Sequence, residues 1–274
     1  MRITSLIENT SLCGFPTEHG LSLYIELNDG TRVLFDMGQG TLFAQNALRL
    51  GLNIADVDVA IVSHGHYDHG GGLEHFLTLN TKAKVFIHEQ AFESHYSLRE
   101  NGLHFIGINP ELKANKRITL CSGTADLGHG LTLFSGVNGT CCLPKGNRLL
   151  YGAARTHDRF EHEQNLIVKE DESMVLVAGC AHCGIVNILD HAEQMLHMRP
   201  TYLLAGMHLV KSGLSEEEEN AFIGELSQHL LKRKWCQFHT MHCTGTDQFS
   251  KLKCIMGKQI NYLSCGESIT IQSK

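Results

Sequence analysis

The sequence lacks an apolar run of the roughly 18 residues that a membrane-spanning helix needs, and we find no secretory signal peptide at its start. It also lacks an excess of basic residues, since 23 Lys and Arg stand against 29 Asp and Glu, for a net charge of -6. Because a nucleic-acid surface needs a basic stripe, this charge argues against general nucleic-acid binding but allows a small local basic pocket. We therefore expect a cytoplasmic protein that binds neither membrane nor nucleic acid.

Histidine and cysteine are abundant instead, with 18 and 10 residues in a chain of 274. Without a secretory signal, the cysteines are predicted to be thiols in a reducing compartment rather than a disulfide framework. With 42% hydrophobic and 19% charged residues, the chain can bury a large core. No linker or low-complexity segment divides it, and its oligomeric state stays open.

One stretch carries four metal-capable side chains within six residues, in the sequence Ser-His-Gly-His-Tyr-Asp-His-Gly-Gly-Gly at 63–72. It follows the apolar run 57–62, which is typical of a buried strand. In an extended backbone His64 and His66 point the same way and can hold one ion. Asp68 and His69 follow where the chain turns and can face a second ion. The alternative, a run of surface histidines before a glycine turn, fits this spacing less well.

The same order, a strand followed by a metal-capable residue, recurs three times in the second half. The strand predicted at 174–178 precedes Cys180 and His182, the one at 201–205 precedes His208, and the one at 235–239 precedes His242. Helices are predicted between these strands, at 185–197 and from the cap Ser215 to residue 231. This alternation indicates an α/β protein.

The first half is predicted to contain strands at 3–7, 21–27, 32–35 and 84–88 and helices at 41–50 and 72–79. The strand at 32–35 ends on Asp36, whose carboxylate can orient a metal-site histidine or a loop amide. A solvated turn aspartate is the alternative. Residues 260–271 are expected to close a sheet edge.

Together with the histidine stretch, four segments resemble the metallo-β-lactamase superfamily, and within it a subgroup called dihydropteroate-synthase-like or β-ribofuranosylaminobenzene 5′-phosphate synthase-like. These segments are 18–22, 34–39, 179–185 and 242–245. The resemblance spans about residues 18 to 245. It implies a four-layer αββα sandwich, formed as a single domain over residues 1–274, with residues 91–160 shaping the substrate pocket.

The resemblance also implies a site for two divalent metal ions, with Zn²⁺ favoured and Mn²⁺ or Fe²⁺ as alternatives. The implied ligands of the first ion are His64, His66 and His182. Those of the second are Asp68, His69 and His242. Many relatives carry an aspartate where this chain has Cys180, so a thiolate either ligates metal there or Cys180 is a small buried residue.

In function, the resemblance implies a metallohydrolase, or an enzyme of a related group transfer, that acts on an anionic small molecule such as a phosphorylated pterin or ribosyl compound. Asp68 would orient the attacking water, and His208 would transfer a proton, stabilise an oxyanion or contact the substrate. Arg155, with Lys145 next, is a candidate contact for the anion. A plain surface arginine is the alternative.

Two other classes use the same fold. Diiron members of the superfamily reduce oxygen or nitric oxide, but they usually have Glu where His66 stands and carry a flavin domain. A non-catalytic effector-binding protein is the third possibility, which the intact ligand motifs disfavour.

Overall fold

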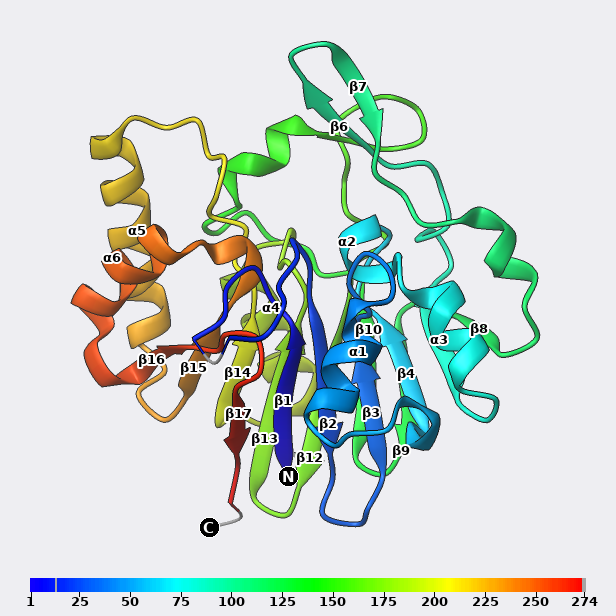
Figure 1. Ribbon diagram of the computed structural model, residues 1–274. Coiled ribbons are helices and arrows are strands. Elements are labelled where there is room, and N and C mark those ends of the chain that lie inside the picture. The colour runs from blue at the N-terminus through cyan, green and yellow to red at the C-terminus, as the bar shows by residue number, and fades with distance from the viewer. Residues whose placement is uncertain (13, 273–274) are drawn as a thin grey trace.

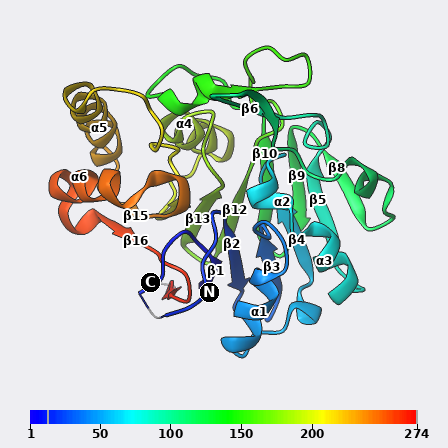
Figure 2. The same cartoon turned by 45° about the horizontal axis from the view of Figure 1, so that its top comes forward.

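Two seven-stranded sheets face each other in the structure, a computed structural model that describes residues 1–12 and 14–272 (Figures 1 and 2). The first sheet has the order β17-β1-β2-β3-β4-β5-β8. Its strands are β1 Arg2–Ile7, β2 Ser22–Glu26, β3 Arg32–Phe35, β4 Val59–Val62, β5 Lys84–His88, β8 Ile118–Cys121 and β17 Ser268–Thr270. Pairing is antiparallel from β17 to β3 and parallel from β3 to β8.

The second sheet has the order β16-β15-β14-β13-β12-β10-β9. Its strands are β9 Thr124–Gly128, β10 Leu131–Ser135, β12 Gln164–Glu170, β13 Ser173–Ala178, β14 Tyr202–Ala205, β15 Gln237–Thr240 and β16 Ile260–Tyr262. The strands from β13 to β16 pair parallel, which requires crossover connections. The helices α4 (Ile185–Leu196), α5 (Glu216–Leu231) and α6 (Thr246–Met256) supply these crossovers.

Alternation of side chains along the strands divides the core into three apolar layers. Between the sheets, Phe35 and Ile61 share one buried cluster with Val177 and Leu204. A second cluster joins the outer face of the second sheet to α4, α5 and α6. A third joins the outer face of the first sheet to α1 (Leu42–Arg49) and α3 (Leu73–Leu79). The predicted four-layer αββα sandwich is therefore confirmed.

The parallel halves of both sheets place their carboxyl-terminal strand ends at one edge of the sandwich. Ala178, Ala205 and Thr240 stand level in three neighbouring strands of the second sheet. The residues that follow these strands therefore meet the turn after β4, where the short helix α2 (Tyr67–Gly70) begins. A smaller sheet stands over this edge in Figure 1. It consists of β6 (Tyr96–Arg99), β7 (Gly102–Phe105) and β11 (Leu150–Tyr151).

Most elements lie within two residues of their predicted bounds, including the box that Ser215 and Glu218 form at the start of α5. Three differences stand out. A helix after His242, predicted to be capped by Thr244 or Thr246, is present as α6 but follows Gly245 as its N-cap. Residues 260–271 form two strands that close edges of different sheets. The short elements β6, β7, β9 and α2 were not predicted, because they expose much of their surface or lack an apolar period.

Two further features bear on the cell compartment. Among the described helices, none is both long and apolar enough to cross a bilayer. No disulfide joins the cysteines within residues 1–12 and 14–272.

The layer between the sheets should dominate stability. Leu204 has no exposed surface and lies in this layer, so Leu204→Ala should lower the free energy of unfolding by about 2–5 kcal/mol. Leu48→Ala is the matched control, because Leu48 is 78% exposed on α1, and it should change stability by less than about 0.5 kcal/mol. Urea unfolding followed by circular dichroism measures both. Equal losses in the two variants would contradict this layer's role.

Candidate metal centre

Three histidines from two separate segments meet at the edge of the sandwich. His64 and His66 come from the bend between β4 and α2, and His182 comes from the turn after β13. Ring nitrogens of the three lie within 4.8 Å of one another. Their Nε2 atoms are buried and have no hydrogen-bond partner. Burial lowers the pKa of each ring well below its usual range, so all three are neutral at neutral pH. Converging, unpaired nitrogen atoms are what a cation requires.

A second set of side chains lies beside the first. His69 Nε2 and His242 Nε2 are 3.2 Å apart. The Asp68 Oδ2 atom is 3.4 Å from the His242 nitrogen and 3.9 Å from the His69 nitrogen. Burial alone would raise the pKa of Asp68, but the surrounding histidines hold it well below its usual range, so the carboxylate is ionised.

Hydrogen bonds on the far side of the rings fix which nitrogen carries the proton. His69 Nδ1 donates to Asp36 Oδ2 at 2.7 Å, and His242 Nδ1 donates to Asn9 Oδ1 at 2.8 Å. A neutral imidazole has one N–H, so both Nε2 atoms present lone pairs. Two lone pairs 3.2 Å apart repel each other unless a proton or a metal ion lies between them. Burial opposes a charge on His69, but the Asp36 and Asp68 carboxylates raise its pKa, so a positive charge at this position is favoured. This arrangement fits a metal ion at the second position.

The same argument applies to the first position. Ser63 Oγ donates to Asp36 Oδ2 at 2.8 Å, so it accepts from His64 Nδ1, also at 2.8 Å. Asn147 Oδ1 accepts from His182 Nδ1 at 3.0 Å, while the Asn147 amide nitrogen donates to the His182 carbonyl and thereby fixes the amide's orientation. Both rings therefore present Nε2 lone pairs to the centre. Partners of this kind orient metal-binding histidines.

His19 is a contact that the sequence did not predict. Its Nε2 lies 3.2 Å from Asp68 Oδ2. Because His19 Nδ1 accepts from the Asn9 side chain at 3.3 Å, the proton sits on Nε2 and is donated to Asp68. His19 therefore holds the carboxylate and is no ligand in this tautomer.

Two buried glutamates were also missed, since each reaches the site from a distant part of the chain. Glu8 Oε1 accepts from the His242 backbone N–H at 2.7 Å. Glu163 accepts from the backbone N–H groups of His182 and Cys183 at 2.6 and 2.9 Å. These carboxylates fix the two turns that carry the later histidines.

Gly179 keeps the two sheets close at the site. A side chain there would place Cβ 2.3 Å from Ser63 Oγ and 3.2 Å from His64 Nδ1. Glycine is thus required, because any larger residue would push the turn after β13 away from the first histidine motif.

Cys180 lies within the second set. Its Sγ atom is 3.2 Å from His69 Nε2, and Cys180, His64 and His69 form one group of potential ligands. Burial raises the pKa of the Cys180 thiol, so a thiolate at this position needs a cation beside it. The position is compatible with a ligand to the second ion.

A cavity of about 540 Å³ opens onto the site. Asp68, His66, His182, His208 and His242 line it, with Arg99 and Lys211 also in its wall. His208 has a left-handed backbone (φ 45°), and its buried Nδ1 has no hydrogen-bond partner. Its ring centre lies 4.4 Å from that of His182.

The predicted anion contacts lie elsewhere. Arg155 is exposed and places its guanidinium 5.6 Å from the centre of the Tyr96 ring, outside the lining of this cavity. Lys145 lines a neighbouring cavity of about 950 Å³, whose wall also includes His182. Only one of the candidate metal ligands lines the larger cavity. The smaller cavity is therefore the candidate place for the reaction.

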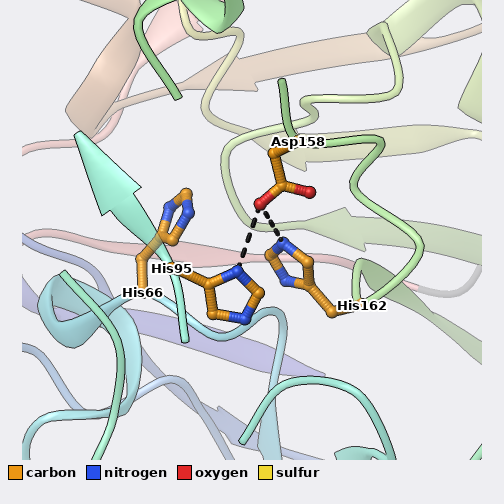
Figure 3. Close-up of side chains that lie close together, drawn as sticks. All are labelled: His66, His95, Asp158 and His162. Carbon is orange, nitrogen blue, oxygen red and sulfur yellow. Dashed lines mark hydrogen bonds and ion pairs between the residues drawn. The ribbon is translucent and has the colours of Figure 1, made fainter. Parts of the chain in front are cut away.

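Figure 3 shows a further group of His95, Asp158 and His162 beside His66. Asp158 Oδ2 accepts from His95 Nδ1 at 3.1 Å and from His162 Nε2 at 3.2 Å. Burial lowers the pKa of His162 to about 4, so this ring is neutral and has one N–H. Its Nδ1 accepts from the Gly65 backbone N–H at 3.0 Å, which leaves Nε2 as the donor to Asp158. The group is therefore a hydrogen-bonded brace on the turn between His64 and His66.

Comparisons with known proteins bear on the family and the fold. Residues 16–186 match the sequence profile of the metallo-beta-lactamase superfamily. An uncharacterised protein of Methanocaldococcus jannaschii is 29% identical over 91% of this chain and 93% of the relative. The 7,8-dihydropterin-6-methyl-4-(beta-D-ribofuranosyl)-aminobenzene-5′-phosphate synthase of the same organism is 26% identical over 84% of this chain and 82% of the relative.

A solved structure, that of Tm1679, described as a metal-dependent hydrolase of the beta-lactamase superfamily, matches with a TM-score of 0.82. The two sequences are 30% identical, and the match covers all of both chains. An isothiocyanate hydrolase from Delia radicum gut bacteria matches with a TM-score of 0.57 at 14% identity, which supports the fold alone.

The two sets of converging side chains predict the metal content. This centre should hold close to two divalent ions per chain, and His64→Ala and His242→Ala should each lose mainly one, because each removes a ligand from a different set. His75→Ala, a half-buried histidine on α3, is the matched control and should keep both. Elemental analysis after dialysis measures the content. Full occupancy in all three variants would contradict the assignment.

Asp158 should affect metal affinity although it is not one of the candidate metal ligands. Asp158→Asn weakens the bonds that fix His162 and His95, so we expect metal affinity to fall by about 10- to 100-fold while the circular dichroism spectrum stays unchanged. Competition with a chromophoric chelator measures the affinity. Asp247→Asn, on the exposed first turn of α6, is the control. If both variants bind metal like the wild type, Asp158 has no positioning role.

Proposed function

Because the chain belongs to the metallo-β-lactamase superfamily, we propose that it is a metal-dependent hydrolase, or catalyses a related group transfer, at a site for two divalent ions. The observation that carries the proposal is the convergence of three unpaired histidine nitrogens beside a second set, in which the Nε2 atoms of His69 and His242 lie 3.2 Å apart. Ions held there would lower the pKa of bound water and polarise the scissile group of a substrate. Nitrogen and sulfur donors favour zinc, with iron or manganese as alternatives.

The side chains around the ions have separate tasks in this proposal. Asp68 is ionised and is held by the His19 N–H, so it can accept a proton from the attacking water and orient it. His208 lines the same cavity as Asp68, and its buried Nδ1 has no hydrogen-bond partner. It is our candidate for proton transfer to the leaving group or for stabilising negative charge.

The proposed substrate is a small anionic molecule. Arg99 and Lys211 stand in the wall of the cavity, where they can contact a phosphate or carboxylate away from the scissile bond. A relative that makes a ribosyl aminobenzene phosphate supports a phosphorylated substrate of the pterin or ribosyl type. We propose a cytoplasmic location because exposed and half-buried thiols persist best in a reducing compartment, and we propose no nucleic-acid partner because the chain is acidic.

The test is a screen of the metal-replete protein against phosphodiesters, phosphomonoesters, lactones and thioesters, with and without a chelator. Activity should disappear on chelation and return with metal. Activity that survives exhaustive chelation would contradict the proposal.

The anion pocket is tested with the best phosphorylated substrate. Arg99→Ala should raise KM by about tenfold, since a charge-assisted hydrogen bond at a partly solvated site is worth about 1.5 kcal/mol. The kcat for a small uncharged ester should stay near the wild-type value. Arg49→Ala, exposed on α1, is the control.

Arg155→Ala separates the two assignments of the anion contact. A KM increase in Arg155→Ala but not in Arg99→Ala would place the contact on Arg155 and contradict the assignment to Arg99.

A further inference from the structure

A third group of metal-capable side chains lies away from the candidate metal centre. The adjacent cysteines Cys141 and Cys142 meet His229 from the last turn of α5. The two sulfur atoms are 3.8 Å apart, and the Cys141 sulfur is 3.6 Å from each ring nitrogen of His229. One ligand atom from each of the three residues falls within 4.8 Å of the others. None of these residues lines the 540 Å³ cavity.

The separation of the two sulfurs matches that in a metal site, since zinc bound tetrahedrally at about 2.3 Å from sulfur places two sulfurs about 3.8 Å apart. The Cys141 sulfur is equally far from both ring nitrogens, so the His229 ring must turn to direct one nitrogen at an ion. Thiolate and imidazole together select zinc and its softer relatives over magnesium or calcium.

The backbone holds the two cysteines in place. Asn187 of α4 accepts from the Cys141 N–H at 3.1 Å and donates to the Cys141 carbonyl at 3.0 Å. Cys142 adopts a left-handed conformation (φ 48°), which a residue with a Cβ adopts at a cost. Burial and the neighbouring thiol raise the pKa of Cys142 to about 12. A thiolate there therefore needs a positive ion as its partner.

We propose that Cys141, Cys142 and His229 bind a third metal ion of the zinc class, with a fourth position open to water. Glu225 lies one turn before His229 on α5, and its negative charge acts on Cys142. It faces the same region and can compensate the charge of the ion.

The ion would hold the loop that contains Cys141 and Cys142 against helix α5, which carries His229. The same loop extends to Lys145, whose Nζ lies 5.2 Å from the centre of the Phe222 ring on α5, and to Asn147, which orients His182. Binding at the cysteines would thus stabilise the segment that positions one of the candidate ligands. Its role is structural, so the proposal stands apart from the chemistry proposed for the main centre.

The experiment is a Cd²⁺ titration of the full chain after metal-free protein has received two equivalents of zinc, enough for the main centre alone. Cadmium bound by thiolate gives an ultraviolet charge-transfer band, and elemental analysis counts the ions. Wild type should bind cadmium in addition to the zinc that it retains, and the ion should protect two thiols from a thiol reagent. The double variant Cys141→Ser/Cys142→Ser should bind no added cadmium ion and should show no charge-transfer band. It also lacks the two thiols that the ion protects in wild type.

Two further variants sharpen the result. His229→Ala should weaken cadmium binding while the zinc content stays the same. Cys254→Ser, which removes an exposed cysteine of α6, should behave as wild type. If the double variant binds as much cadmium as wild type, or if wild type binds none beyond the main centre, the third site does not exist. Loss of zinc from the main centre in wild type would instead count against the proposed function.

Discussion

The buried carboxylate of Asp36 is the contact on which the candidate metal centre depends. It accepts from the Ser63 backbone N–H at 2.7 Å, from the Ser63 hydroxyl and from His69 Nδ1. One residue thus fixes the end of β4, the tautomer of His69 and, through Ser63, the tautomer of His64. Asp36 reaches these groups from the end of β3 in a left-handed conformation (φ 60°). A strained backbone conformation of this kind persists only where neighbouring groups hold it in place. Here the three hydrogen bonds to the Asp36 carboxylate do so, in a site that is closed to water.

The sequence predicted much of the fold because its strands are apolar runs bounded by turn residues, and it located the ligand motifs because each directly follows such a run. It did not predict the contacts that orient the ligands. Asn9 and Glu163 stand in irregular segments and Asn147 in a short 3-10 helix, and nothing local to them indicates that they reach His242 or His182. Arg155 was chosen for its place in the chain, whereas Arg99, on an unpredicted hairpin, is the arginine in the cavity wall.

The centre is costly to form, because it buries several histidine nitrogens that nothing in the described chain satisfies. Each unsatisfied buried polar group costs about 1–3 kcal/mol. The three apolar layers of the sandwich offset this cost, and the hydrogen bonds behind the rings hold the lone pairs in place. A bound cation would recover the cost at the site itself, so metal binding and folding stability should be linked.

The two positions of the centre differ in charge. The first is formed by three neutral rings, while the second includes the ionised Asp68 and lies close to Cys180 and to the carboxylate that holds His69. A cation at the second position therefore gains direct electrostatic attraction, whereas one at the first relies on nitrogen donors alone. Cys180 adds to this difference only as a thiolate, and burial opposes its ionisation unless the ion is present. Ion binding and Cys180 ionisation would consequently be coupled, because a thiolate at this buried position gains a partner for its charge only when the ion binds.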